Sequence, residues 1–196
     1  AVFTPESTQE EVYEETRPLV SSALDGYNVS VFAYGQTGSG KTHTMGMMNS
    51  RALQDLFKIA DEKRMIAKYD FKLSAIEIYN EQVRDLLEPN DASGKQKKLD
   101  VKTDPATGAS TVPDMLHSPC ASTNDVDRLM DLATKNRTSA STTMNQHSSR
   151  SHLILTVHIT RIDLVNGGTL FGKLHLIDLA GSERLSRTGA EGDRLT

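Results

Sequence analysis

Apolar and polar residues alternate in the first third of the chain in patterns that predict helices and strands in turn. A capping-box signal at Ser7 or Thr8 precedes apolar residues at helical spacing, which predicts a helix over 8–25. Pro18 removes a backbone donor inside it, so we expect either a kink there or a second helix with Pro18 in its first turn. Residues 29–34 predict a strand, and a second helical pattern follows a glycine-rich loop.

The middle of the chain continues with a strand, a loop and a helix. Residues 71–79 predict the strand, and the Pro-, Gly-, Asp- and Lys-rich stretch 88–111 predicts a loop with at most a short strand near Leu99 and Val101. The clearest amphipathic helix begins after Ser122, and its apolar face repeats at positions i, i+3, i+4 and i+7. These apolar residues are Val126, Leu129, Met130 and Ala133.

A polar stretch without periodicity, residues 136–152, precedes two long strand patterns over 153–164 and 170–178. The strand patterns flank Asn166-Gly167-Gly168, which predicts a hairpin. We find no internal repeat and no interdomain linker, so the chain is one compositional unit.

Composition narrows the class of protein. A chain of 196 residues with 37% hydrophobic and 24% charged residues suits one globular domain, or part of one, and argues against disorder. The longest apolar runs are far short of about 20 residues, and the first ten residues lack a signal-peptide pattern, so we expect neither a membrane span nor secretion. A single cysteine, Cys120, excludes an internal disulfide and a multi-cysteine zinc site and fits a reducing compartment.

Charge is unevenly placed along the chain. The net charge is −4, but residues 1–30 hold six acids and one base, which gives −5 and leaves +1 for the remainder. That balance provides no field to attract nucleic acid, so we expect no nucleic-acid partner.

A phosphate-binding motif follows the first predicted strand. Residues 35–42, GQTGSGKT, match G-x-x-x-x-G-K-[ST], and the strand before and helix after supply the context that a phosphate cradle needs. The glycines allow backbone N–H groups to turn toward phosphate oxygens, and the helix amino terminus adds a partial positive charge. Lys41 is placed to reach the β- and γ-phosphates, and the Thr42 hydroxyl to ligate Mg²⁺.

A P-loop fold, in which such a motif binds phosphate, also needs an acid at the end of a neighbouring buried strand to hold the water shell of the metal. The apolar run 174–177 closes on Asp178 and supplies this carboxylate. With Asn166-Gly167 as a two-residue turn, the hairpin register places Asp178 beside Leu155, although Gly167-Gly168 as the turn would shift that register. The loops before residue 153 and after Asp178 must then be neighbours, and the same register places Arg150 across from Glu183 as an ion pair.

These motifs together resemble the motor domains of kinesins over essentially the whole chain. Residues 32–45 (FAYGQTGSGKTHTM) are similar to the kinesin nucleotide loop, 145–152 (NQHSSRSH) to the first switch, and 178–183 (DLAGSE) to the second switch. Residues 77–87 form a further kinesin-like stretch. Myosins share related switches, but Ser151-His152 and the DLAGSE form favour kinesin. The fold that the resemblance implies is an α/β, three-layer P-loop NTPase-type fold with a central mixed sheet flanked by helices.

The resemblance also implies roles for individual residues. Ser149 would be a second hydroxyl ligand of Mg²⁺ beside Thr42, with Asp178 acting through water. Asn145 and Ser148 would close on the γ-phosphate and the attacking water, the Gly181 backbone N–H would sense the γ-phosphate, and Glu183, paired with Arg150, would relay the proton. His43 is expected either near the base or as a surface histidine at a helix start. The implied nucleotide-binding residues are Gly35, Gln36, Thr37, Gly38, Ser39, Gly40, Lys41, Thr42 and His43.

The function implied is that of an ATP-hydrolysing, Mg²⁺-dependent, microtubule-stimulated motor located on cytoplasmic or spindle microtubules. Dimerisation would use a coiled coil outside this chain. Residues 1–196 are expected to be an incomplete motor domain, without the first strand and adenine-contact segment and without the track-binding helix onward. The stretch 45–51 is also shorter than is usual in the family. The segments 25–29 and 77–87 resemble kinesins with a carboxy-terminal motor.

Two other functions are weighed against the motor. A non-motile module could keep the fold and bind tubulin or nucleotide without turnover. The intact motif residues argue against it, namely Lys41, Thr42, Ser149, Arg150, Asp178 and Glu183. A switch GTPase is disfavoured because the sequence has no N-K-x-D base-reading motif.

Overall fold

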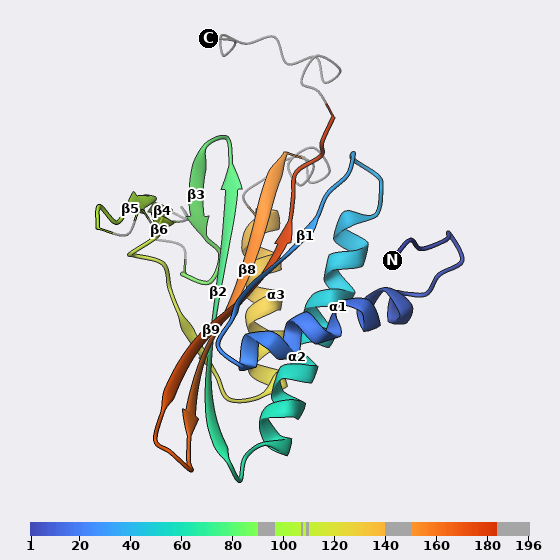
Figure 1. The fold of residues 1–196 in the computed structure, drawn as a ribbon. Coiled ribbons are helices and arrows are strands. Elements are labelled where there is room, and N and C mark those ends of the chain that lie inside the picture. Colours follow the sequence, from blue (N-terminus) through green and yellow to red (C-terminus); the bar gives the residue numbers. More distant parts are fainter. Residues whose placement is uncertain (90–96, 107, 109, 140–149, 184–196) are drawn as a thin grey trace.

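A mixed β-sheet forms the centre of the computed structural model, and helices run along one of its faces (Figure 1). The structure describes residues 1–89, 97–106, 108, 110–139 and 150–183. The main sheet has the strand order β1-β9-β8-β2-β3-β4, with β7 also beside β2, while β5 and β6 form a small separate pair. The strands are β1 (Asn28–Ala33), β2 (Ala67–Tyr79), β3 (Gln82–Asp85), β4 (Lys98–Leu99), β5 (Lys102–Thr103), β6 (Ser110–Thr111), β7 (Ser118–Cys120), β8 (Ser151–Asp163) and β9 (Thr169–Asp178).

Only β1 and β9 run parallel among the pairs of the described sheet, and the other pairs are antiparallel. The predicted mixed sheet with flanking helices is therefore confirmed. The helices among the described residues share one core on one face of the sheet, so these residues show two of the three predicted layers. Parallel pairing matters for the site because it brings the carboxyl ends of β1 and β9 to the same edge, with Ala33 beside Asp178.

Among the described residues, three helices pack against the sheet: α1 (Gln9–Leu24), α2 (Lys41–Glu62) and α3 (Thr123–Ser139). At the start of α1, the Thr8 hydroxyl accepts the Glu11 N–H and the Glu11 carboxylate accepts the Thr8 N–H, which is the predicted capping box. The helix is continuous with Pro18 inside it, so the alternative of a second helix beginning at Pro18 is wrong. None of the helices in the described ranges has the length and apolar character that crossing a membrane requires.

One hydrophobic core fills the space between the helices and the sheet. Alternate residues of four adjacent strands point to it, and they meet apolar side chains from all three helices. Strand members of this core include Val31, Leu176, Leu155 and Leu73. The core therefore fixes α2, and with it the loop that precedes α2, against β1 and β9.

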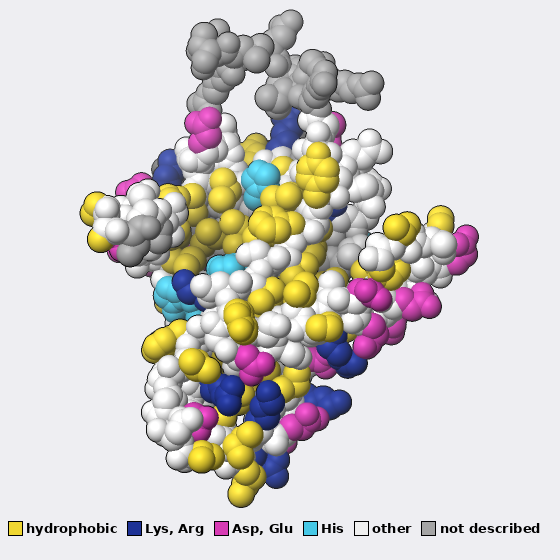
Figure 2. All heavy atoms as spheres, viewed as in Figure 1, with side chains coloured by type: hydrophobic (Ala, Val, Ile, Leu, Met, Phe, Trp, Pro, Cys, Tyr) yellow, Lys and Arg dark blue, Asp and Glu magenta, His cyan; other side chains and the backbone are white. Residues whose placement is uncertain are grey.

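The opposite face of the sheet carries a smaller apolar cluster, in which Ile76, Val83 and Leu99 are buried. Figure 2 views this face and shows apolar and histidine side chains gathered on it. Two strand histidines have partners within the sheet: His158 bonds Ser74 at 3.1 Å, and His175 bonds Thr156 at 2.9 Å.

Several element boundaries differ from the prediction. The strand expected over 71–79 begins at Ala67, because its first residues pair with the far end of β8. The short strands β3 and β7 were not predicted, since both are stabilised by pairing with β2 rather than by a pattern of their own. Helix α3 extends through Ser139 into the polar stretch 136–152 because the buried Asn136 amide donates to the Leu86 carbonyl.

The hairpin of β8 and β9 forms, but its register differs from the prediction by two residues. Asp178 pairs with Leu153 rather than with Leu155. The reason is that the Asp163 carboxylate accepts the backbone N–H groups of Val165 and Asn166, which widens the connection to four residues, 164–167. The predicted two-residue turn is therefore wrong.

Candidate functional site

The glycine loop, residues 35–42, leaves the end of β1 and enters α2, as predicted. Residues 36–40 of the loop are exposed, so a ligand can reach them. Gly40 is the residue before α2, and its φ of 91° lies in the left-handed region that glycine adopts without strain. Within the part of the chain that the structure describes, no side chain caps α2 at Gly40, so the amino terminus of this 22-residue helix is available to an anion.

The Lys41 side chain folds back over this loop, and its Nζ donates to the Gln36 carbonyl oxygen at 3.0 Å. The loop after β9 runs beside it, because the Ser182 N–H donates to the Gly35 carbonyl at 3.0 Å. One lysine ammonium therefore lies on the same exposed loop as a helix amino terminus, an arrangement suited to phosphate oxygens.

Asp178 lies at the base of this loop. Its Oδ2 accepts a hydrogen bond from the Thr42 hydroxyl at 2.7 Å, and the side chain is only 4% exposed. Its other oxygen, Oδ1, is buried and forms no hydrogen bond within the described residues. A buried carboxylate oxygen without a donor is costly, and Mg²⁺ binds through oxygen ligands, often with its water shell retained. Thr42 and Asp178 therefore fit a magnesium site.

Glu183 also contacts the glycine loop. Its carboxylate accepts the Thr37 N–H at 2.9 Å and also the Thr37 hydroxyl. These hydrogen bonds, the hydroxyl one first, lower the pKa of Glu183 from its usual value and keep it ionised. Gly181 is tightly enclosed here, because a side chain at that position would collide with Glu183 and Thr37.

The predicted ion pair between Arg150 and Glu183 is not among those that the described residues form; Glu183 binds Thr37 instead. The shifted hairpin register gives the physical reason. Continued past the strands, the observed register sets Arg150 opposite Gly181 rather than opposite Glu183. The two loops were predicted to be neighbours, and this is confirmed where the structure describes them, because the Ala180 N–H donates to Nδ1 of His152, the second residue of β8, at 3.1 Å.

The structure describes some of the other predicted site residues and not others. His43 is exposed and its ring bonds the Gln9 side chain, which ties the start of α2 to the start of α1. Asn145, Ser148 and Ser149 lie outside the described residues. The sequence predicted Thr37 only as part of the nucleotide loop, and it did not predict the contact of Thr37 with Glu183.

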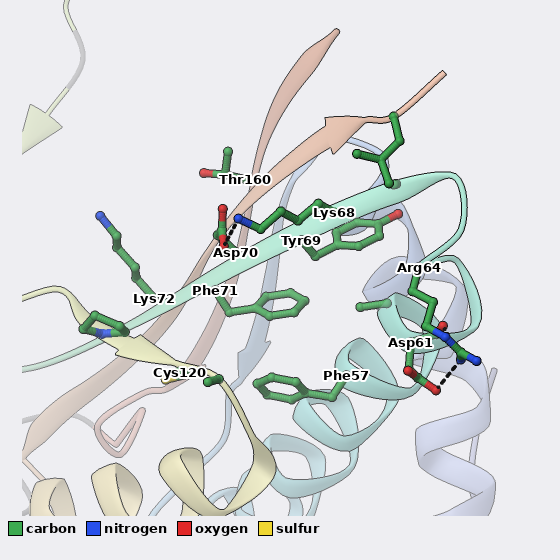
Figure 3. Close-up of a pocket in the computed structure, with 15 residues that line it drawn as sticks. Phe57, Asp61, Arg64, Lys68, Tyr69, Asp70, Phe71, Lys72, Cys120 and Thr160 are labelled. Atoms are coloured by element: carbon green, nitrogen blue, oxygen red, sulfur yellow. Dashed lines mark hydrogen bonds and ion pairs between the residues drawn. The ribbon is translucent and has the colours of Figure 1, made fainter. Parts of the chain in front are cut away.

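A hollow lies at the end of α2 that is farther from the glycine loop. Its volume is about 860 Å³, and Figure 3 shows Phe57, Tyr69 and Phe71 along it with Arg64 and Lys68 nearby. The Phe57 and Phe71 rings are 4.8 Å apart between centroids. Because α2 has 22 residues, about 33 Å separates its two ends, and the residues that line this hollow include none from the phosphate loop.

Sequence comparison decides the family. The profile described as "Kinesin motor domain" matches residues 1–196. The chain belongs to the kinesin motor domain family. Among curated relatives, Kinesin-like protein KIN-14K of Oryza sativa subsp. japonica is 50% identical over 203 residues, which cover 99% of this chain and 20% of that protein. The chain thus spans about a fifth of the length of the curated relatives that it matches.

Solved kinesin structures agree. The structure of a fast kinesin matches 99% of this chain and 56% of its own, with a TM-score of 0.87 and 34% sequence identity. A C-terminal motor and motor homology domain of Kar3Vik1, fused to a synthetic heterodimeric coiled coil, matches 97% of this chain and 49% of its own, with a TM-score of 0.80 and 36% identity. The kinesin fold, predicted from three motifs, is therefore confirmed, and the second match accords with the resemblance to carboxy-terminal motors.

Proposed function

We propose that the protein is an ATP-hydrolysing microtubule motor and that residues 1–196 supply its nucleotide site. The observation that carries this proposal is the Thr42–Asp178 hydrogen bond beneath the glycine loop, with a second Asp178 oxygen buried and unpartnered. Membership of the kinesin family supports it, and so does the likeness to the fast kinesin, a relative whose structure bears on its ATPase mechanism and its interactions with microtubules.

In this proposal the chain holds the nucleotide mainly by position and charge, as phosphoryl transfer requires. The backbone of residues 35–40 surrounds the phosphates, and Lys41 exchanges the Gln36 carbonyl for a phosphate oxygen. Thr42 and Ser149 would hold Mg²⁺, with Asp178 binding its water shell; the ion, when bound, neutralises charge on the phosphates.

The residues around the γ-phosphate would do the remaining work. Asn145 and Ser148 orient the attacking water, and the Gly181 N–H senses the γ-phosphate. Glu183 takes the proton through solvent, and its Thr37 partner holds it in place. Arg150 remains its proposed partner in the nucleotide-bound state, in which both loops would rearrange.

Movement, cellular site and assembly follow from the same proposal. Loss of the γ-phosphate would release the segments that carry these residues and alter microtubule binding. A cytoplasmic or spindle location on microtubules and a dimer formed through a coiled coil elsewhere in the protein are part of it. The Kar3Vik1 match pairs a motor domain with a motor homology domain on a synthetic heterodimeric coiled coil, an arrangement compatible with this mode of assembly.

The test is phosphate release by the full-length protein with ATP and microtubules, compared with the Lys41→Ala variant. We expect the variant to lose at least about 100-fold in turnover, because it removes a charge aimed at the phosphates. Lys58→Ala, at an exposed lysine on the same helix, is the matched control and should keep full turnover. A wild-type protein that binds ATP but releases no phosphate would instead indicate the non-motile module, and preference for GTP over ATP would indicate a GTPase.

A further inference from the structure

A buried charged cluster lies between α3, β2 and β8, away from the glycine loop. Glu77 of β2 is completely buried, and the Arg137 side chain in the last turn of α3 is 13% exposed. Arg137 Nε lies 3.3 Å from Glu77 Oε1, and Arg137 Nη2 donates to the Ser151 hydroxyl at 3.0 Å. Ser151, the first residue of β8, is also fully buried.

Burial of this kind needs a reason, because moving two charged groups out of water is expensive even when they pair. The guanidinium is suited to the position: its rigid fork presents donors in two directions and so holds a carboxylate and a hydroxyl together. A lysine ammonium at the same place lacks that planar fork. The cluster therefore depends on arginine in particular and not on positive charge alone.

Two of the three residues lie where one element ends and the next described element begins. Arg137 lies two residues before the end of α3, and Ser151 begins the next described strand. The Arg137–Ser151 hydrogen bond thus fixes where the chain leaves α3 relative to where it enters β8, and Glu77 fixes both to the centre of the sheet. Asn145, Ser148 and Ser149, which belong to the proposed site, are in the sequence between these two fixed points.

The same fixed point also bears on the loop after β9. Ser151 is followed by His152, whose Nδ1 accepts the Ala180 N–H, and Ala180 precedes Gly181. Glu183 of that loop in turn binds Thr37 of the glycine loop. A continuous set of described contacts therefore runs from Arg137 to the loop that holds phosphate.

We propose that Arg137 is a positioning residue, which sets the start of β8 through Ser151 and thereby, through the His152–Ala180 hydrogen bond, the loop after β9 that carries Gly181 and Glu183. The inference rests on the proposed ATPase function. It assigns Arg137 no contact with nucleotide, so its loss should misplace the reacting groups rather than remove a binding contact. Turnover should then fall while the KM for ATP changes little.

The test compares Arg137→Lys and Ser151→Ala in the full-length protein. The measurements are microtubule-stimulated kcat, the KM for ATP, and the urea midpoint of unfolding. We expect Arg137→Lys to lower kcat at least about tenfold and Ser151→Ala about threefold or more, with KM within about threefold of wild type, because misplacement acts on kcat. The double variant should lose no more than Arg137→Lys alone, because both changes break the same contact.

Arg128→Lys is the matched control, since Arg128 lies on the same helix with its side chain 75% exposed. It should leave kcat unchanged. If Arg137→Lys does not fold, Ser151→Ala, which removes only one oxygen atom, carries the test alone.

Three outcomes would overturn the inference, and they are distinguishable. If wild type turns over and both folded variants keep kcat within about twofold, Arg137 has no positioning role, because misplacement should cost more than that. A fall in kcat that matches the loss of folded protein would likewise assign Arg137 to stability only. A wild-type protein without turnover would instead overturn the proposed function, and this inference with it.

Discussion

Replacing Asp178 by asparagine should stabilise the protein when no metal or nucleotide is present. The change keeps the size of the side chain and leaves an acceptor for the Thr42 hydroxyl, which now binds the carboxylate at 2.7 Å. A hydrogen bond to a charged group contributes about 1.5–3 kcal/mol and a neutral one about 0.5–1.5, so this bond weakens by about 1 kcal/mol. Against that, the variant removes a buried charge whose desolvation costs several kcal/mol.

The new amide still leaves a buried polar group without a partner where Oδ1 lay, which retains about 1–3 kcal/mol of penalty. The net expectation is a gain of about 1–2 kcal/mol in the free energy of unfolding without ligand. With Mg²⁺ and ATP at about 100 times their dissociation constant, the wild type should gain about 2.7 kcal/mol from binding, and the variant should gain little. The order of stability of the two proteins should therefore reverse.

The assay is urea unfolding of the full-length protein and the Asp178→Asn variant, first with EDTA and then with Mg²⁺ and ATP. Asp61→Asn, at an exposed carboxylate on α2, is the control and should follow the wild type under both conditions. Destabilisation of the Asp178→Asn variant in EDTA would refute the reasoning, since it would mean that the carboxylate is well satisfied in the protein itself. An equal gain from Mg²⁺ and ATP in both proteins would refute the assignment of Asp178 to the metal.

Two further predictions concern turnover and pH. Gly181→Ala should push the Glu183 side chain away from Thr37. The change should cost little stability, because flexible side-chain ends can move, but it should lower the rate of phosphate release at least about tenfold. An unchanged rate would show that the position of Glu183 is not needed. Burial, with His117 and Lys173 nearby, lowers the pKa of His158 to about 4. The unfolded chain therefore binds a proton more readily than the folded one, and the free energy of unfolding should decrease as the pH is lowered from about 6.5 to about 4. His158→Gln should weaken that fall in urea unfolding at pH 7 and 4.5, and an unchanged pH dependence would contradict it.

Local pattern predicted the elements that carry the site. The helix of 8–25, the strand before the glycine loop, the amphipathic helix after Ser122 and the long hairpin all form, because each has a strong repeat or cap of its own. Motif spacing then placed Lys41, Thr42 and Asp178 together, and the parallel β1–β9 pairing shows why they meet.

What the sequence did not predict depends on contacts between distant residues. The hairpin register followed from the way Asp163 binds the backbone of its own loop, and the error of two residues displaced Arg150 from Glu183. The buried Glu77–Arg137 contact joins residues 60 positions apart, with no local signal to reveal it. Both features were missed because the hydrogen-bond partners of a polar side chain depend on the folded structure, whereas the periodicity of apolar residues can be read directly from the sequence.

The central claim is that a nucleotide site in this chain drives a motor on microtubules, and a titration of phosphate release with microtubules tests it most directly. The full-length protein, supplied with Mg²⁺ and ATP, should release phosphate slowly alone and faster as microtubules are added, until the rate saturates. A rate that stays the same at every microtubule concentration, with ATP bound, would contradict the claim.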